Sequence, residues 1–465
     1  MIRRGLSRFR FCMVGCAVMV LATTWLSKPL AQPAVAITTH PPRPTSMASG
    51  AATFHQDVSN TAQQATSAEQ QLHVFGQLWD AVNDSYVYPD FNGYDWQAAK
   101  PKIEAQIRAG LTDDAFYTLM RELINNLNDD HSSYLSPSEA LVEEQEYAGD
   151  QEYVGIGIYV AVNPVRSYLY VLSVYADSPA QQAGLKAHDH ILQIDGAPSV
   201  NADGDSQDEL MRGPENTTVT LLVRTPGQQT REVKIVRRPV LARERIIYRL
   251  LPTPVQTTST TSAISPTRAS ARIGYMLVPT FFETNIGRRM RDALRALMKQ
   301  ANGQLDGLVI DMRINGGGSY PQLSTALGFF THGTVGNLVN RGGTKQKINI
   351  RAQSIGNSQT VPLAVLIGPA TESYAEVYAG ALQANGRAIL IGKPSAGNIE
   401  TLLRHDFDDG SLAWIAEETF VLPDGSGWEG VGLKPNVSVG AAWDEMTDEN
   451  DLAIAAAVKA LQANP

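Results

Sequence analysis

The stretch between residues 273 and 391 places the strongest constraint on the fold, because short apolar runs alternate there with helical ones. The apolar runs cover residues 273–278, 308–312, 363–367 and 388–391, and the helical runs between them cover residues 286–301, 321–330 and 375–384. Alternation of this kind predicts an α/β core with a largely parallel sheet. We expect a last helical run, residues 449–461, to pack on the outside of that core.

The region that precedes this core has a helical pattern. Apolar residues recur at helical spacing, first as Leu72, Phe75, Trp79 and Val82 and later as Phe116, Leu119, Leu123 and Leu127. We therefore expect an N-terminal helical subdomain over residues 68–148.

The first 36 residues have the order of an export signal. Four arginines are followed by an apolar run over residues 11–26, and small residues then end at Ala36. A charged start, a short apolar run and an A-x-A-like site predict a cleaved signal peptide over residues 1–36. The protein is then exported to a periplasmic or extracellular location. The alternative is an uncleaved segment that associates the protein with a membrane.

Composition excludes several functions. Both cysteines, Cys12 and Cys16, lie inside the export segment, so a cleaved chain has no thiol for a disulfide, for thiolate catalysis or for a zinc site. The histidines have no metal-ligand spacing, and we expect neither a metal nor a cofactor. A net charge of −9 argues against a nucleic-acid partner. Residues 37–67 are rich in Thr, Pro, Ala, Ser and Gln and are expected to form a disordered tether.

Residues 153–240 change to short β-branched runs broken by turns. Within them, residues 178–196 read S-P-A-x-x-A-G-L-x-x-x-D-x-I-L-x-I-D-G, which resembles a PDZ domain of the circularly permuted kind found in bacterial proteases. The resemblance implies a PDZ-like domain over residues 149–242 that binds an extended peptide as an added strand. The backbone N–H groups of Gly155, Ile156 and Gly157 would hold the terminal carboxylate. The alternative is that these glycines only form a turn.

Ser373 lies where a strand-like run ends and a helical run begins. Free N–H groups and the helix dipole favour negative charge at such a place. A serine there is by itself more often a helix cap than a nucleophile.

Two motifs resemble the carboxy-terminal processing (tail-specific) serine peptidase family. Residues 373–376, Ser-Tyr-Ala-Glu, match the family's Ser-x-Ser-Glu, and residues 311–318 resemble its Asp-Leu-Arg-x-Asn-x-Gly-Gly loop. The resemblance implies that Ser373 is the nucleophile and that Gly317 or Gly318, together with Tyr374, forms an oxyanion hole. It also implies a ClpP/crotonase-like α/β peptidase core over residues 243–465, with the helical subdomain in front and the PDZ-like β-rich domain inserted.

The general base departs from the commonest pattern of this family. Ser/Lys members carry a lysine where this chain has Asn398, and an amide cannot accept a proton near neutral pH. Lys393, five residues earlier, is one alternative base. The tricorn-like branch instead uses Ser with His and Glu, and its motifs fall on His131 as the base and on Glu429 as the acid that orients it.

The roles of two further residues near this triad stay open. Asn398 and Glu400 are candidates for supporting positions, and Glu400 is an alternative partner for His131. The expected function is hydrolysis of peptide bonds in protein or peptide substrates whose C-terminal segments the PDZ-like domain recognises. The rival from another class is a non-catalytic protein that keeps the peptidase fold and binds a peptide or a small ligand, since the family lysine is missing.

Overall fold

The computed structural model describes residues 66–129, 131–147, 152–241, 243–252 and 271–463. The expected export signal and nearly all of the expected tether lie outside these residues. No helix within the described ranges is long and apolar enough to cross a membrane.

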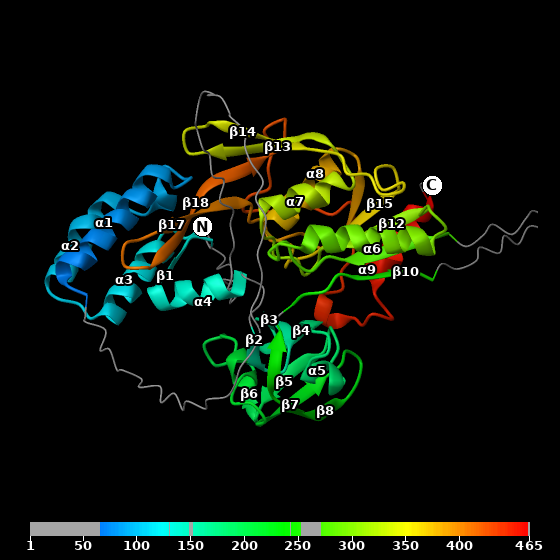
Figure 1. Ribbon diagram of the computed structural model, residues 1–465, viewed down its shortest axis with the longest axis horizontal. Helices are drawn as coiled ribbons and strands as arrows, with labels where there is room; N and C mark the ends of the chain where they lie inside the picture. The colour runs from blue at the N-terminus through cyan, green and yellow to red at the C-terminus, as the bar shows by residue number, and fades with distance from the viewer. Residues whose placement is uncertain (1–65, 130, 148–151, 242, 253–270, 464–465) are drawn as a thin grey trace, which may run out of the picture.

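A six-stranded sheet forms the centre of the larger unit (Figure 1). All its neighbouring strands run parallel except the first pair, which confirms the largely parallel α/β core. Three central strands are buried at every residue, as expected for a sheet covered on both faces. In sheet order the strands are β10 (Ile247–Leu250), β11 (Ile273–Leu277), β12 (Gly307–Asp311), β15 (Leu363–Ile367), β16 (Ala388–Gly392) and β19 (Val437–Ser438).

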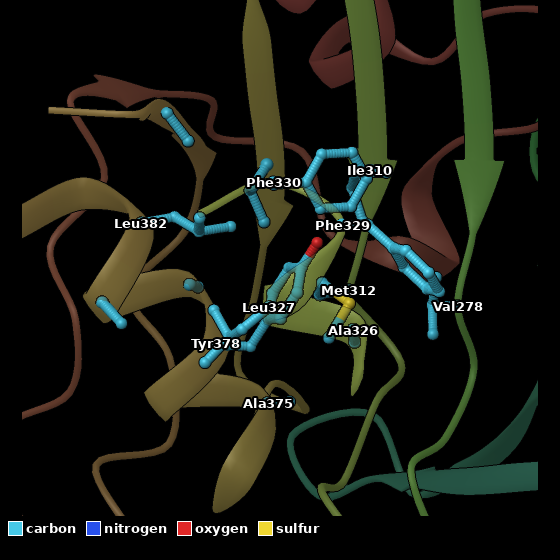
Figure 2. Close-up of a cluster of buried hydrophobic side chains, with 14 of the residues drawn as sticks. Val278, Ile310, Met312, Ala326, Leu327, Phe329, Phe330, Ala375, Tyr378 and Leu382 are labelled. Atoms are coloured by element: carbon cyan, nitrogen blue, oxygen red, sulfur yellow. The ribbon is translucent and has the colours of Figure 1, made fainter. Parts of the chain in front are cut away.

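Helices cover both faces of this sheet. Along β12, Ile310 packs into the core with α6 (Ile286–Gln300), α7 (Tyr320–Gly328) and α8 (Tyr374–Ala384), whereas Val309 packs with α9 (Leu452–Ala463). Side chains of neighbouring strand residues point to opposite faces, which explains the division. Figure 2 shows Tyr378 and Leu382 of α8 beside Leu327 of α7 and the end of β12. This packing holds the first turn of α8 in place.

A second, antiparallel sheet joins the N-terminal helices to the core. Its order is β1 (Ser133–Leu135), β18 (Leu412–Val421), β13 (Gly333–Asn340) and β14 (Lys345–Ile350), with β17 (Glu400–Asp406) also paired to β18. Strand β1 pairs with β18 through Ser133 opposite Trp414, and β17 pairs with β18 through Arg404 opposite the same Trp414. The pairing brings the chain around residue 131 to the strand that begins at Glu400.

The N-terminal part contains α1 (Ala68–Ser85), the short η1 (Phe91–Gly93), α2 (Trp96–Arg108), α3 (Asp113–Asn125) and α4 (Pro137–Tyr147). Ser67 and Gln70 cap α1 reciprocally, which satisfies two of its free N–H groups. Trp79 of α1 stacks on Trp96 of α2 at 4.5 Å between ring centroids. The buried face of these helices packs on Leu402, Trp414 and neighbouring residues of β17 and β18.

The PDZ-like unit lies below the core in Figure 1. Its main sheet runs β3 (Ile158–Asn163), β4 (Tyr168–Val174), β5 (His190–Ile194), β7 (Thr218–Arg224) and β8 (Thr230–Val236), with β6 (Ala197–Pro198) on β5. Strands β2 (Glu152–Gly155) and β9 (Arg238–Leu241) form a separate pair. The unit also contains α5 (Pro179–Gln182) and η2 (Asp208–Met211). Strand β3 ends the main sheet, so one of its edges is available for an added strand.

Two buried histidines fasten the PDZ-like unit to η3 (Trp443–Glu445) of the C-terminal segment. His188 Nδ1 lies 2.7 Å from the carbonyl oxygen of Trp443, and His190 Nε2 lies 2.6 Å from that of Asp444. The His188 ring also packs on the Trp443 indole at 4.3 Å. Arg224 donates to Nδ1 of His190. Since an arginine can only donate, His190 is neutral, with its proton on Nε2.

Protonation of His190 would disrupt this contact. Burial holds the pKa of His190 below its usual value, and the Arg224 guanidinium acts in the same direction against the Asp444 carbonyl. The other charged or titratable groups near the ring are Arg166, Tyr168, which stacks on the ring at 4.5 Å, and the Asp444 carboxylate, whose charge raises the pKa of His190. A second proton, on Nδ1, would point at the guanidinium of Arg224.

Acid is therefore expected to loosen the PDZ-like unit. Because the folded pKa of His190 is depressed, its neutral form stabilises the fold above the unfolded value of 6.5, and this stabilisation is lost as the pH falls through the folded pKa. The melting temperature of the wild type should thus fall more steeply from pH 7 to pH 5 than that of His190→Gln. His73→Gln, which removes an exposed histidine paired with Asp408, is the control and should follow the wild type. Parallel curves for all three proteins would contradict the prediction.

Candidate active site

Ser373 stands in a strained conformation at the start of α8. Its φ of 53° and ψ of −129° lie in a region that side chains other than glycine rarely adopt. Its hydroxyl makes no capping hydrogen bond to the helix. A capping serine has extended backbone angles and accepts an N–H bond, so the capping alternative does not describe this residue. Strain of about 1–3 kcal/mol is characteristic of functional sites.

The glycine loop after β12 lies directly against this serine. A Cβ built on Gly317 would be 2.7 Å from Ser373 Cβ and 3.1 Å from its Oγ. Gly317 donates its own N–H to Asn315 Oδ1 at 2.8 Å. Within the described ranges, the N–H groups of Gly318 and Tyr374 have no such partner. Of the three residues expected for an oxyanion hole, these two therefore have N–H groups available.

Glu376, in the first turn of α8, holds the neighbouring loop. Its buried carboxylate accepts bonds from Ser395 Oγ at 2.5 Å and from the backbone N–H groups of Gly397 and Asn398, each at 2.9 Å. Burial raises the pKa of Glu376 to about 7 in spite of these donors. The carbonyl oxygen of Asn398 in turn accepts the N–H of Ser373 at 2.8 Å. The loop and the strained serine are thus fixed to each other.

His131 reaches the same place from the other end of the chain. Its side chain is 3 % exposed and lies between two carboxylates. Nε2 is 3.3 Å from Oε1 of Glu372, the residue before Ser373, and Nδ1 is 3.0 Å from Oε2 of Glu400. Asn398 Nδ2 also donates to Oε1 of Glu372 at 2.8 Å. Three expected site residues, His131, Ser373 and Asn398, therefore gather around Glu372.

The carboxylate at Nδ1 of His131 is Glu400 and not Glu429. Glu429 lies beside Glu400, and its Oε2 accepts the N–H of Ile399 at 2.7 Å. Burial would raise the pKa of Glu400, but the hydrogen bond and charge of His131 and the hydroxyl of Tyr88 outweigh it, and the pKa lies below its usual value. Burial and the adjacent Glu400 raise the pKa of Glu429 to about 8. The opposite directions of these two shifts favour the charge on Glu400, beside His131, and the proton on Glu429.

Lys393 lies in a different environment. It follows β16 and lines a cavity with Arg313, Pro369 and Trp443, and Ser373 is not among the residues that line this cavity. The position that sequence comparison assigned to the family lysine holds Asn398, which does contact the serine backbone.

The expected carboxylate loop of the PDZ-like unit follows β2. Gly157 has a φ of 82°, and a Cβ there would meet Ser178 at 2.4 Å, so a close backbone approach requires glycine. The carbonyl oxygens of Ile156 and Gly157 accept N–H groups of Ala180 and Tyr175. The loop leads straight into the edge strand β3.

Sequence reasoning missed three residues of this site. Glu372 and Glu376 stand within or beside the motif around Ser373, so the motif itself was a signal for both. The hydroxyl of Tyr88 donates to Glu400 at 2.7 Å. Tyr88 precedes Glu400 by more than 300 positions, so no local pattern in the sequence indicates this contact.

Comparison with protein families agrees with the architecture. Residues 272–439 match the model of peptidase family S41, residues 170–225 match the PDZ domain, and residues 67–125 match the tricorn protease C1 domain.

Curated relatives and solved structures extend this result. The carboxyl-terminal-processing protease of Synechocystis sp. is 28 % identical over 376 residues, which cover 80 % of this chain and 81 % of the relative. The chloroplastic C-terminal processing peptidase of Tetradesmus obliquus is also 28 % identical, over 81 % of this chain and 78 % of its own. A solved photosystem II D1 C-terminal processing protease is 26 % identical, with a TM-score of 0.57 over 80 % of this chain and 93 % of that one. A putative S41 protease from Bacteroides fragilis, 14 % identical, has the same TM-score over 83 % of this chain and 97 % of that one, and shares the fold. Residues 272–439 therefore match peptidase family S41 and residues 170–225 match a PDZ domain, and the chain is similar over about four-fifths of its length to carboxyl-terminal-processing proteases.

Proposed function

We propose that this protein is an exported serine endopeptidase in which Ser373 attacks the peptide carbonyl, His131 accepts the serine proton, and Glu400 orients the imidazole. The observation that carries the proposal is the conformation of Ser373, which is strained, packed against the glycine loop and free of a capping bond. Export rests on the pattern of residues 1–36.

The roles follow from acyl transfer by a serine and a histidine. Nδ1 of His131 lies 3.0 Å from the carboxylate of Glu400, which leaves Nε2 as the nitrogen that exchanges protons. In the described conformation Nε2 faces Glu372, so proton transfer requires Nε2 to exchange this carboxylate for Oγ of Ser373. The N–H groups of Gly318 and Tyr374 would stabilise the oxyanion that forms. The imidazole then returns its proton to the leaving amine.

Substrate capture is assigned to the PDZ-like unit. The edge of β3 can accept an extended peptide, and the loop of Gly155, Ile156 and Gly157 at its start would bind the terminal carboxylate. Recognition of C-terminal segments is consistent with the carboxyl-terminal processing after which the relatives are named.

A fluorophosphonate probe tests the nucleophile and the base together. The wild type should be labelled at Ser373, as located by mass spectrometry of the digested protein. His131→Ala should lose nearly all labelling, and Lys393→Ala should keep it, because Lys393 lies in a cavity that does not include Ser373. Loss of labelling in Lys393→Ala with retention in His131→Ala would replace the proposed base. A folded wild type that is never labelled would refute the peptidase mechanism.

The two glutamates are expected to differ sharply on substitution. Glu400→Gln removes the charge at Nδ1 of His131 and should lower kcat by about 10³–10⁴-fold. In Glu429→Gln the new amide resembles the protonated carboxyl that a pKa of about 8 favours at pH 7, so kcat should fall by less than about tenfold. Steady-state cleavage of a fluorogenic peptide measures both. If Glu429→Gln proves the more damaging variant, Glu429 orients His131.

Glu429 should also make stability depend on pH. Its folded pKa of about 8 is above the ordinary 4.5, so the folded state binds the proton more tightly, and this contribution is lost as the pH rises through that interval. The free energy of unfolding of the wild type should therefore fall relative to that of Glu429→Gln from pH 5 to pH 8. Urea titrations at each pH measure the difference, and a constant difference would contradict the raised pKa.

A further inference from the structure

A cavity of about 80 Å³ lies where the PDZ-like unit meets the core. Strand β4 forms one wall, the chain after β15 and β16 forms the second, and residues 439–446 with the start of α9 form the third. The carboxyl ends of parallel strands are a common place for ligands in open α/β sheets. One ordered water needs about 10–15 Å³, so the cavity has room for a ligand of about five to eight non-hydrogen atoms.

Two cationic side chains line this cavity. Lys393 is half-buried and, within the described part of the chain, forms no ion pair. Arg313 is about nine-tenths buried. Its Nη2 donates to Asp311 and Asp451, each at 2.6 Å, whereas among the described residues Nη1 donates only to the sulfur of Met446 at 3.4 Å. A thioether is a weak acceptor, so a charged N–H group remains without a strong partner.

The acidic groups near the cavity are already engaged. Asp444 Oδ2 accepts bonds from Asn163 and from the Tyr168 hydroxyl, each at 2.7 Å. Glu445 pairs with Arg166 at 2.8 Å. Asp451 caps the first N–H groups of α9, and Asp311 also accepts the hydroxyl of Tyr275. Asp448 pairs with His188 at 3.6 Å. The N–H of Ala442 lowers the pKa of Glu445 most, and the charge of Lys393 acts in the same direction. Lys393 nevertheless forms no ion pair within the described residues, so its ammonium is the cation of the cavity without a direct carboxylate partner.

The remaining walls are apolar and well fixed. Leu172, Val439, Met446 and Trp443 contribute them. The Trp443 indole packs against the His188 ring and lies 5.0 Å from the Arg313 guanidinium. Its Nε1 donates to the carbonyl oxygen of Val171 at 3.0 Å. Apolar walls with a small number of fixed polar groups are the usual form of a small-molecule site.

We propose that this cavity binds a small monocarboxylate with an apolar body of about three to five carbons. The carboxylate lies between Lys393 Nζ and Arg313 Nη1, and the apolar body lies against Trp443 and Leu172. Such a group is supplied either by a free short-chain acid or by the apolar C-terminal residue of a peptide. Occupancy would join β4 to the loop Gly368–Ala370, which continues through Thr371 to Ser373. The site thus goes beyond the proposed peptidase chemistry.

Calorimetric titration with pentanoate tests the site in full-length Ser373→Ala protein, where no peptide is cleaved and the peptidase mechanism plays no part. Pentanoate should bind saturably. Lys393→Met should weaken binding by about tenfold or more, since a charge-assisted bond is lost. Lys434→Met removes an exposed lysine outside the cavity and should bind like the parent. Val439→Phe retains both cations but fills the space, and it should also abolish binding.

The remaining ligands test whether the carboxylate is required and whether the natural ligand is a free acid or a peptide. Pentan-1-ol, which keeps the apolar body, should bind at least about tenfold more weakly than pentanoate. A peptide that ends in a free apolar residue should compete with pentanoate if peptides are the source, and its amidated form should not. Absence of competition assigns the site to free acids. Absence of saturable pentanoate binding, or equal affinities for the parent, Lys393→Met and Val439→Phe, would overturn the proposal.

Discussion

Replacement of Ser373 by alanine is expected to abolish peptide hydrolysis, with a loss of at least about 10⁴-fold in kcat and complete loss of fluorophosphonate labelling. The hydroxyl is the group that forms the covalent bond, and the remaining donors cannot replace it. Alanine keeps the strained backbone angles, so the melting temperature should stay within about 2 °C of the wild type. Cleavage of a fluorogenic peptide and thermal unfolding measure the two effects.

Two further serine variants sharpen this test. Ser373→Gly should be as inactive as the alanine variant but more stable by about 1 kcal/mol, because glycine adopts a φ of 53° without strain. Ser426→Ala, which changes an exposed turn serine bonded to Asp424, should keep full activity. If Ser373→Ala still hydrolyses peptide after removal of contaminating proteases, the nucleophile is elsewhere. An unchanged stability in Ser373→Gly would mean that the serine is not strained in solution.

Replacement of Gly318 by alanine is expected to have the largest effect on the fold around the site. A Cβ at this position would lie 2.0 Å from the carbonyl carbon of Phe281 and 2.3 Å from its oxygen. Both are backbone atoms of a bridge between Phe281 and Gly318, so neither can move aside by rotating a side chain. The φ of 141° adds strain for any other residue. We expect a loss of about 3–5 kcal/mol in the free energy of unfolding and loss of activity.

A glycine in open surroundings provides the control. Gly76 lies inside α1 with nothing within 4 Å of a built Cβ. Gly76→Ala should raise the free energy of unfolding by about 0.5–1 kcal/mol and leave activity unchanged, because alanine is the better helix former. Urea unfolding of both variants measures the contrast. If Gly318→Ala is as stable as the wild type, the glycine loop is not packed as described and the oxyanion-hole proposal loses its basis.

Local patterns were sufficient to predict the strands and helices that alternate between residues 273 and 391 and the position of Ser373 between two of them, but not the strands of the second sheet. The run at 363–367 became β15 and the run at 375–384 became α8, because an apolar run of that length or period has few alternatives once it is buried. The same holds for residues 178–196, where turn residues and apolar residues alternate at fixed positions. The boundary between β15 and α8 therefore already marked Ser373 in the sequence.

The partner of His131 could not be predicted in the same way. Glu400 and Glu429 both follow Ser373 in the chain, and the motif alone favoured Glu429. The structure places Glu400 at Nδ1 because β1 and β17 flank the same strand, β18, and because Ile399 occupies the carboxylate of Glu429. Likewise, the lysine nearest in sequence to the family position lines a separate cavity with Arg313. Such distinctions depend on register between strands, which no local pattern specifies.

By itself, the amino-acid sequence determined the strands and helices that alternate between residues 273 and 391, and that a serine would begin a helix after a buried strand. Burial period and turn chemistry act over a few residues, so they can be read along the chain. Only the tertiary structure decided which side chains surround that serine. The pairing of β1 with β18 joins residues separated by more than 270 positions, and this long-range contact brings His131 between Glu372 and Glu400.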